Sequence, residues 1–337
     1  MAASLIRPEE AQRIWVWLEH DGTSLEGVSL ELLAKGRELA DRSGEGLVGL
    51  LMGHELDSLA DEALGYGADE IVVAEDPLLE VYTTDAWCDA AAQVVLEKKP
   101  NILLFGATPD GRDLAGRLAV RLRTGLTADC TDLEIKTDEP ALMLAAEVTG
   151  FGGGVAAIIA CKENRPQMAT VRPGVFRPAL RRSHGEEGVQ SRCPVRIDPG
   201  RVRTRVLERR IGEAVDITKA EALVVGGRGV KGDFGLLETL AGLLGAELGA
   251  SRVAVDEGWI EKDRMIGQTG SVTRPKVAIV CGVSGAMQFT VGIMEADTVV
   301  AINSDPEAPI FESADYCVVD DLFSILPPLI RELENSR

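Results

Sequence analysis

The sequence predicts an α/β protein with two domains, each built on a mainly parallel sheet that is flanked by helices. Strand-like and helix-like segments alternate from residue 13 to residue 122, and the alternation returns after about residue 210. Such alternation is typical of parallel sheets, because a helix usually connects two parallel strands and covers one face. Nearly all glycine-rich and polar loops follow strands of the second half. We therefore expect domains at 1–209 and 210–337, the second of a dinucleotide-binding type.

The first domain shows the alternation most plainly. Strands are expected at 13–19, 47–52, 70–74 and 101–105, and helices at 30–40, 54–64, 86–97 and 110–122. Thr108-Pro109-Asp110 introduces the last helix, because a capping side chain there precedes a proline at the first helical position. These elements predict a parallel sheet with helices on both faces.

The pattern changes near Cys130. Strands without intervening helices are expected at 132–136, 141–147 and 155–160. The glycine run at 150–154 is either a phosphate-binding loop or a tight turn, and the lack of a helix start after it favours the turn. Residues 181–210 are polar with charges of both signs, which is typical of a solvated linker or an edge strand, so we place the domain boundary near their end.

The second domain repeats the alternation over a shorter length. Strands are expected at 222–225, 276–281, 298–303 and 317–319, and helices at 236–246 and 286–295. Ligands of open parallel sheets bind at the carboxyl ends of the strands. The loops that follow these strands therefore mark the expected binding edge.

Composition and charge exclude several classes of protein. The net charge is −19 without a basic stripe, which argues against nucleic-acid or anionic membrane partners. No apolar run approaches the roughly 20 residues that span a bilayer. The segment from Met1 to Glu10 lacks the apolar core of a secretory signal, so we expect a cytoplasmic protein.

Cysteine and histidine usage excludes further chemistry. The cysteines are scattered without a CxxC pair, so we expect no zinc or iron–sulfur site and no other metal. The histidines are His20, His54 and His184, which excludes histidine-led catalysis within the second domain.

Polar and glycine-rich loops recur along the second domain. They lie at 226–229, 251–258, 266–270, 282–285 and 301–305. Glycine lets a backbone approach a phosphate, Arg228 supplies a cationic fork, and we expect 282–285 to open a helix whose N-terminus attracts an anion. Each loop alone is equally typical of a turn. Together they indicate a dinucleotide site.

The order of these motifs resembles a known family. GGRG, GASRVAVDEG, IGQTG, GVSGAMQ, AINSDPEAPIFESADY and VVDDL follow one another as in the FAD domain of electron-transfer flavoprotein alpha subunits, over about residues 222–330. In the first domain LTADC at 126–130 and RPQMATVRPG at 165–174 also resemble the family. The latter string is similar to its anaerobic, often bifurcating branch.

The resemblance implies FAD as the cofactor and a role for each matching residue. Arg252, beside Ser251, would lie near the isoalloxazine ring and favour its anionic reduced forms. Gln268 and Thr269 would touch the ring edge, with the Thr269 hydroxyl close to N5. The implied cofactor-binding set is Arg228, Ser251, Arg252, Gln268, Thr269, Gly270, Val283, Ser284, Gly285, Gln288, Phe289, Asn303, Asp305, Asp321 and Leu322.

Within this set, Ser284 and its neighbours would hold the pyrophosphate and Gln288 the flavin or ribityl side. Arg228 would lie by the phosphates or the ribityl chain. Asn303, Asp321 and Leu322 would hold the adenosine end. These roles are implied by the family alone, and no catalytic residue is implied.

The resemblance also implies partners. The chain would form a heterodimer with the smaller beta subunit through its first domain. It would exchange electrons with an acyl-CoA dehydrogenase and with a quinone reductase or a ferredoxin-type protein, without substrate chemistry of its own. In a bifurcating pair the second flavin would sit mainly in the partner.

Two alternatives remain open at this point. A stand-alone NAD(P)-dependent enzyme would share the architecture, but no plausible histidine or tyrosine acid–base group sits in the loops of the second domain. A non-redox scaffold descended from such a subunit would have no need of Arg252, Thr269 and Ser284 together.

The sequence departs from the family at two positions. Phe289 stands where the family usually carries a histidine that donates to flavin O2 and stabilises the one-electron-reduced anion. Either another donor replaces it, or the first reduction is harder here. Ser271 stands where many members have lysine, which removes a positive charge and shifts potentials the same way, weakly if the position is solvated.

Overall fold

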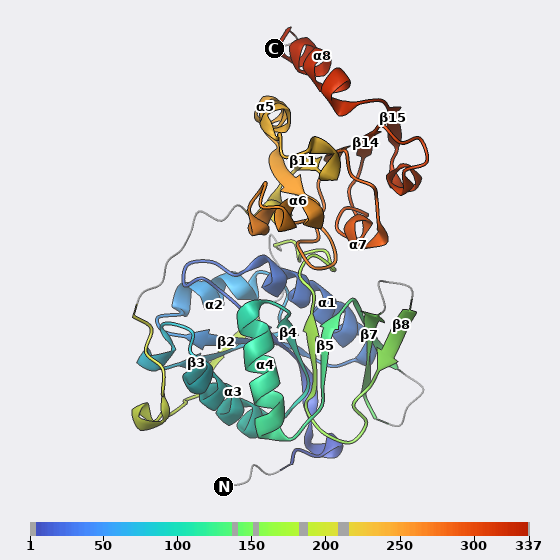
Figure 1. The fold of residues 1–337 in the computed structure, drawn as a ribbon. Coiled ribbons are helices and arrows are strands. Elements are labelled where there is room, and N and C mark those ends of the chain that lie inside the picture. The colour runs from blue at the N-terminus through green and yellow to red at the C-terminus, as the bar shows by residue number, and fades with distance from the viewer. Residues whose placement is uncertain (1–4, 137–140, 151–154, 182–187, 208–215, 336–337) are drawn as a thin grey trace. The chain divides into compact units, whose positions relative to one another are not determined.

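The computed structural model describes residues 5–136, 141–150, 155–181, 188–207 and 216–335. The chain divides into two compact units, Met1–Arg209 and Arg210–Arg337 (Figure 1). Each unit is an α/β layer structure, which confirms the predicted fold class. No helix among the described residues is long and apolar enough to cross a membrane.

The first unit is built on a seven-stranded sheet in which every strand pairing is parallel. Its order is β10-β3-β2-β1-β4-β9-β5. The strands are β1 (Gln12–Leu18), β2 (Leu47–Gly53), β3 (Glu70–Glu75), β4 (Pro100–Gly106), β5 (Leu126–Cys130), β9 (Gln167–Val171) and β10 (Val189–Arg192). The predicted strands of the first half are thus present. β5 and β9 were not predicted as strands, whereas β10 lies at the edge of the sheet, within the segment expected to be either a linker or an edge strand.

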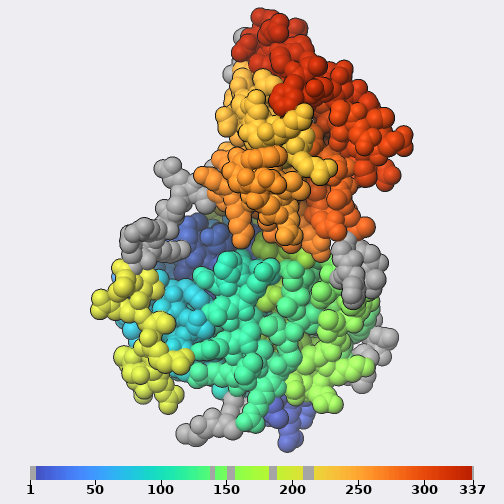
Figure 2. Space-filling view, viewed as in Figure 1, coloured from blue at the N-terminus to red at the C-terminus, as the bar shows by residue number. Residues whose placement is uncertain are grey.

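Helices cover both faces of this sheet. They are α1 (Gly27–Ser43), α2 (Asp57–Leu64), α3 (Thr84–Lys98) and α4 (Pro109–Leu122). Alternate side chains of each strand enter different cores, so Trp15 and Trp17 pack with α3 and α4, whereas Ile14 and Val16 pack with α1 and α2. In the space-filling view α4 forms the teal and green surface at the centre of this unit (Figure 2). Thr108 accepts a hydrogen bond from Gly111 N at 2.9 Å, which confirms the predicted helix start.

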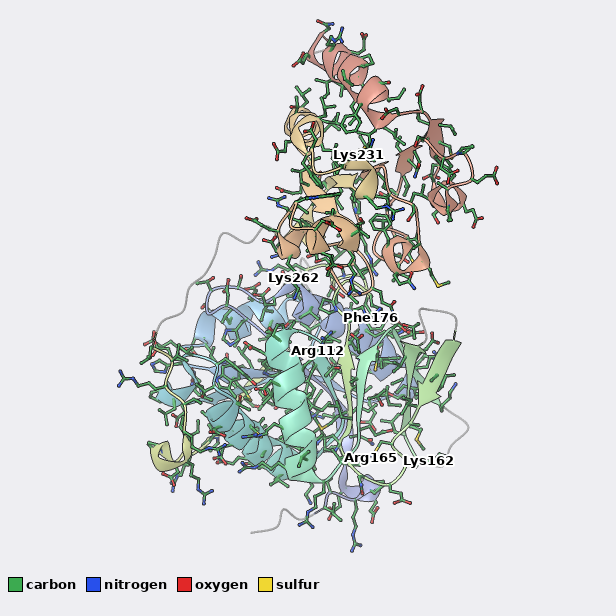
Figure 3. All side chains as sticks on the ribbon, in the orientation of Figure 1. Arg112, Lys162, Arg165, Phe176, Lys231 and Lys262 are labelled. Atoms are coloured by element: carbon green, nitrogen blue, oxygen red, sulfur yellow. The ribbon has the colours of Figure 1, made fainter. Side chains whose placement is uncertain are left out.

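A small antiparallel sheet follows β5 along the chain. It pairs β6 (Asp132–Lys136), β7 (Met143–Gly150) and β8 (Val155–Ile159). Beside it the buried guanidinium of Arg165 donates to main-chain carbonyls, among them Leu142 O at 3.1 Å and Asn164 O at 3.0 Å (Figure 3). The glycine run at 150–154 lies largely outside the described residues, so its role stays a prediction.

The second unit contains a five-stranded parallel sheet with the order β12-β11-β13-β14-β15. The strands are β11 (Ala222–Gly226), β12 (Glu247–Ala250), β13 (Val277–Cys281), β14 (Val299–Asn303) and β15 (Tyr316–Val319), and the helices are α5 (Gly235–Leu244), α6 (Arg252–Asp256), α7 (Met287–Thr290) and α8 (Leu322–Asn335). Apolar cores fill both faces of this sheet. Short β12 and the C-terminal helix α8 were not predicted.

The helix predicted at 286–295 is wrong in extent. α7 has only four residues, Met287–Thr290, and the chain then turns. Thr290 and Val291 are β-branched and Gly292 follows, a combination that disfavours a helix. A Cβ at Gly292 would lie 2.4 Å from Gly267 N, so this turn is pressed against a neighbouring loop. A helix N-terminus is therefore no basis for an anion site here.

Candidate cofactor site

The site lies where the strand order of the second sheet reverses. From β11 the chain passes to β12 on one side, and then crosses to β13 on the other side of β11. The loops after β11 and β13 diverge at such a point, which leaves a crevice at the carboxyl ends of the strands. The predicted binding edge is therefore the edge at which the structure forms its cavity.

Two glycine loops form the floor of this crevice by packing backbone against backbone. Gly227 N donates to Cys281 O at 3.0 Å, and Gly229 N donates to Gly282 O at 2.9 Å. A Cβ at Gly227 would lie 2.5 Å from Gly282 O, and one at Gly229 would lie 2.7 Å from Gly282 Cα. No side chain fits between the loops, so glycine is required by close approach.

A second pair of loops is joined in the same way. Gln268 N donates to Gln288 O at 2.7 Å. Gly267 has a φ of +130°, and a Cβ there would clash with the same carbonyl oxygen, at 2.4 Å. Gly285, at a φ of +83°, lies against the backbone of Ile310, where a Cβ would come within 2.1 Å of the amide nitrogen. The segments that carry the polar side chains are thus held to one another by main-chain hydrogen bonds and close packing.

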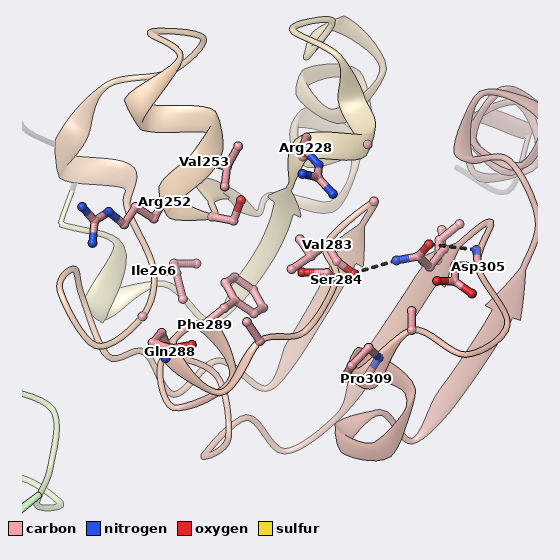
Figure 4. A pocket seen from close by; sticks show the side chains of 18 of the residues that line it. Arg228, Arg252, Val253, Ile266, Val283, Ser284, Gln288, Phe289, Asp305 and Pro309 are labelled. Carbon is pink, nitrogen blue, oxygen red and sulfur yellow. Dashed lines mark hydrogen bonds between the residues drawn. The ribbon is translucent and has the colours of Figure 1, made fainter. Parts of the chain in front are cut away.

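The loops enclose a cavity of about 620 Å³ (Figure 4). All candidate residues line it except Gly270 and Gly285. A Cβ at Gly270 would lie 2.2 Å from Met265 O. Gly270 and Gly285 therefore allow close packing of the loops and do not line the cavity themselves. The structure also brings in residues that sequence reasoning missed, most clearly Lys231, Ser304 and Pro309.

Lys231 had a usable signal in the sequence. It comes three residues after Arg228 and directly before Gly232, in the loop that ends β11 (Figure 3). Its φ is +52°, a left-handed conformation that costs a non-glycine residue about 1–2 kcal/mol. A lysine held in that conformation at a glycine-rich loop indicates a position where the charge, rather than the backbone, determines the residue.

The cations of the cavity differ in their partners. Among the described residues, the side chains of Arg228 and Lys231 form no ion pair, although both line the cavity. Arg252 Nε lies 3.2 Å from a carboxylate oxygen of Asp256. The charges of Arg228 and Lys231, which come from one loop, are therefore available to an anion, whereas that of Arg252 is already partly neutralised.

The loops at the ends of β14 and β15 line the cavity with acidic and amide side chains. Asn303 Nδ2 donates to Val283 O at 2.8 Å, and Asn303 Oδ1 accepts from Asp305 N at 3.0 Å. These bonds fix the Asn303 amide between two loops (Figure 4). Asp321 Oδ1 accepts from Phe323 N at 3.1 Å, so this carboxylate caps α8 as well as lining the cavity.

Apolar groups form the remaining wall. Phe289 is buried at 6% exposure and packs with Ile266, Val283 and Ile310. It has no proton to donate. Cys281 ends β13 beneath the glycine loops, where burial raises the pKa of its thiol to about 12, so it is a neutral group without nucleophilic character at pH 7.

A glycine-lined cavity with unpaired cations, at the reversal point of a parallel sheet, defines a dinucleotide-binding protein. A family model of the electron transfer flavoprotein domain matches residues 14–193, and one of the electron transfer flavoprotein FAD-binding domain matches residues 216–294. The chain belongs to the electron transfer flavoprotein family, as an alpha subunit. It is accordingly an electron carrier that binds FAD.

Whole-chain relatives agree with this assignment. An electron transfer flavoprotein subunit alpha from Thermoanaerobacterium thermosaccharolyticum is 43% identical over 328 residues, 96% of this chain and 98% of that protein. Protein FixB of Clostridium saccharobutylicum is 44% identical over 323 residues, 95% of each chain. The acryloyl-CoA reductase electron transfer subunit beta of Anaerotignum propionicum is 38% identical over 356 residues, 96% of each chain. These sources are in keeping with the anaerobic branch indicated by the sequence.

The residues of the cavity fit FAD. The glycine loops leave main-chain atoms uncovered for close approach of a pyrophosphate, and Arg228 and Lys231 offer unpaired positive charge beside them. Phe289, Ile266 and Val253 supply an apolar wall suited to an aromatic ring. The cavity volume of about 620 Å³ lies within the usual range for cofactor sites.

Proposed function

We propose that this chain is the FAD-binding subunit of a heterodimeric electron carrier, and that the cavity of the second unit holds the cofactor. The observation that carries the proposal is the combination of a glycine-lined crevice with Arg228 and Lys231, which form no ion pair with any residue that the structure describes. The bound flavin supplies the one-electron chemistry. The chain binds it, orients it and limits the access of water.

The charge distribution supports one orientation of the cofactor. Arg228 and Lys231 would bind the pyrophosphate with Ser284, because this part of the cavity combines positive charge with uncovered main-chain atoms. Asn303, Asp305, Asp321 and Leu322 would hold the adenosine end. Gln268, Thr269, Gln288 and Arg252 would surround the flavin ring, with Ser251 and Val283 completing the wall.

A beta subunit is the proposed partner. In the edge strand β8, Ile158 and Ile159 are 65% and 45% exposed. Exposed apolar side chains on an edge strand favour association with another protein. Charge repulsion at a net charge of −19 disfavours association of this chain with itself. These observations support a heterodimer that uses the first unit.

The electron partners are proposed from chemistry and from relatives. The relative from Anaerotignum propionicum is described as an electron transfer subunit of acryloyl-CoA reductase, which supports an acyl-CoA dehydrogenase-type partner for this chain. A quinone reductase or a ferredoxin-type protein would be the other partner. The cytoplasmic location and participation in a bifurcating system stay predictions.

Purification of the chain with its beta subunit tests the proposal. The flavin would be released by denaturation, identified as FAD and counted per dimer, and the complex would then be reduced stepwise without oxygen. We expect at least one FAD per dimer and reduction in one-electron steps. Two flavins per dimer would support bifurcation, whereas a dimer without flavin would indicate the scaffold alternative and contradict the proposal.

A further inference from the structure

Arg252 differs from the other cations of the cavity because it has a carboxylate partner. It is the first residue of α6, and Asp256, the last, lies one helical turn further on. The Arg252 Nε to Asp256 Oδ2 distance is 3.2 Å with donor geometry, so the contact is a charge-assisted hydrogen bond. Figure 4 shows the guanidinium turned away from the ring of Phe289.

The helix itself imposes this pairing. Residues four apart lie on one face of an α-helix, so the side chains of Arg252 and Asp256 are on the same side of α6 and can contact each other. The side chains are 67% and 62% exposed, so the pair is accessible and the bond can break without leaving a buried charge. The bond to Asp256 therefore directs the guanidinium of Arg252, a residue that lines the cavity, away from Phe289.

Glu257 is the neighbouring charge for comparison. It is the C-cap of α6 and exposed, and among the described residues its carboxylate forms no ion pair or hydrogen bond. It carries the same charge as Asp256 one residue further along the chain. If the carboxylates act on the flavin potential only through their electric field, removal of either should have a similar effect. If contact with Arg252 is what matters, only removal of the Asp256 carboxylate should change the potential.

We infer that Asp256 is a positioning residue that sets the reduction potential of the bound flavin by holding Arg252 outward. The inference rests on the proposed placement of FAD in this cavity. One electron added to the flavin adds one negative charge near Arg252. A freed guanidinium would stabilise that charge, so Asp256 keeps the potential lower than Arg252 alone would set it.

The test is a double-mutant cycle on the purified heterodimer. The first one-electron potential of the bound FAD would be measured for the wild type, Asp256→Asn, Arg252→Met and the double variant. We expect Asp256→Asn to favour the reduced form about tenfold, a rise of about 59 mV. In the Arg252→Met background the same change should alter the ratio less than about twofold, near 18 mV.

Two further variants give the controls. Glu257→Gln removes the neighbouring charge and should shift the ratio less than about twofold, and Asp256→Glu should restore the wild-type potential because it keeps the carboxylate. Equal shifts for Asp256→Asn and Glu257→Gln, or a full shift in the Arg252→Met background, would overturn the inference. Flavin per dimer is counted first in each variant, so absence of FAD from the wild-type dimer contradicts the proposed function instead.

Discussion

The two units share an architecture but close the same point of their sheets differently. In the first sheet the strand order reverses between β1 and β4, and in the second it reverses between β11 and β13. Parallel sheets bind ligands at such points. The second unit places Gly227, Gly229 and Gly282 there and leaves a cavity, whereas the first places Glu19 and Thr108 there.

Side chains fill the reversal point of the first sheet. The Thr108 hydroxyl donates to a Glu19 carboxylate oxygen at 2.6 Å, at the start of α4, and the Ser29 hydroxyl donates to Glu19 O at 2.9 Å. A Cβ at Gly106 would lie 2.8 Å from the methyl groups of Val28. The chain's own carboxylate thus lies at a helix N-terminus, where a ligand anion would otherwise bind. The two reversal points therefore differ in one respect: glycines leave space at that of the second sheet, whereas side chains occupy that of the first.

The largest expected effect comes from giving the second unit a side chain at its reversal point. Gly227 has a φ of −111°, which any residue adopts, so Gly227→Val tests the space alone. The valine must displace Gly282 or Val283, at about 3 kcal/mol or more. We expect loss of FAD, measured as flavin per dimer.

Gly242→Ala is the matched control for that variant. A Cβ at Gly242, inside α5, meets nothing within 4 Å. This change should keep FAD and stabilise the unit by about 0.5–1 kcal/mol. Full flavin content in Gly227→Val would show that the loops yield, and the comparison between the units would fail.

The next effect concerns the first unit and pH. Burial raises the pKa of Glu19 to about 7, against the hydrogen bond from Thr108, which lowers it. The folded state therefore holds this proton more tightly than the unfolded state, and Glu19 costs stability as pH rises from about 4.5 to 7. The full cost is roughly 3 kcal/mol above pH 7.

Glu19→Gln keeps an oxygen that accepts from Thr108 and removes the charge. It should stabilise the protein at pH 8 by up to about 3 kcal/mol and have little effect at pH 4.5, as measured by urea unfolding at each pH. Equal changes in the free energy of unfolding at pH 4.5 and pH 8 would mean that Glu19 stays charged at both pH values. A protonated, buried carboxyl would then not occupy the reversal point of the first sheet.

A smaller effect should follow loss of one unpaired cation. Lys231→Met removes a charge that we assign to the pyrophosphate, and a hydrogen bond to a charged group is worth about 1.5–3 kcal/mol. Exposure reduces this, so we expect FAD to bind about tenfold more weakly, measured by titration of the flavin-depleted dimer.

Lys262→Met is the control for charge alone. Lys262 is exposed, lies outside the cavity and forms no ion pair among the described residues (Figure 3). It should leave FAD affinity within about twofold of wild type, and the difference between the lysine variants should shrink at high salt. Equal losses would assign the effect of Lys231 to net charge.

The last effect is on the potential rather than on binding. Phe289→His should introduce a donor toward the flavin, and 1.5–3 kcal/mol corresponds to roughly 65–130 mV on the first one-electron couple. Phe289→Leu also disturbs the apolar wall but adds no donor, so the potential of the histidine variant is compared with it. Equal potentials for these variants would show that another group already serves the flavin.

Sequence reasoning reached the fold class because βα alternation is a local signal. The motifs that mark the loops after β11, β12 and β13 were equally visible, and the structure brings most of the candidate residues to one cavity. The short α7 was not foreseeable from periodicity, since its end depends on the tertiary contact between Gly292 and Gly267. Lys231 was missed because its place in the glycine-rich loop after β11 was not weighed, and its left-handed backbone becomes visible only in coordinates.

The bonds between the glycine loops have a consequence for the timing of cofactor uptake. The amide hydrogens of Gly227, Gly229 and Gln268 are bonded across loops without any contribution from FAD. They should exchange slowly with solvent even in flavin-depleted protein. Little ordering entropy then opposes FAD entry, so a folded and empty subunit should accept its cofactor as a late step of assembly.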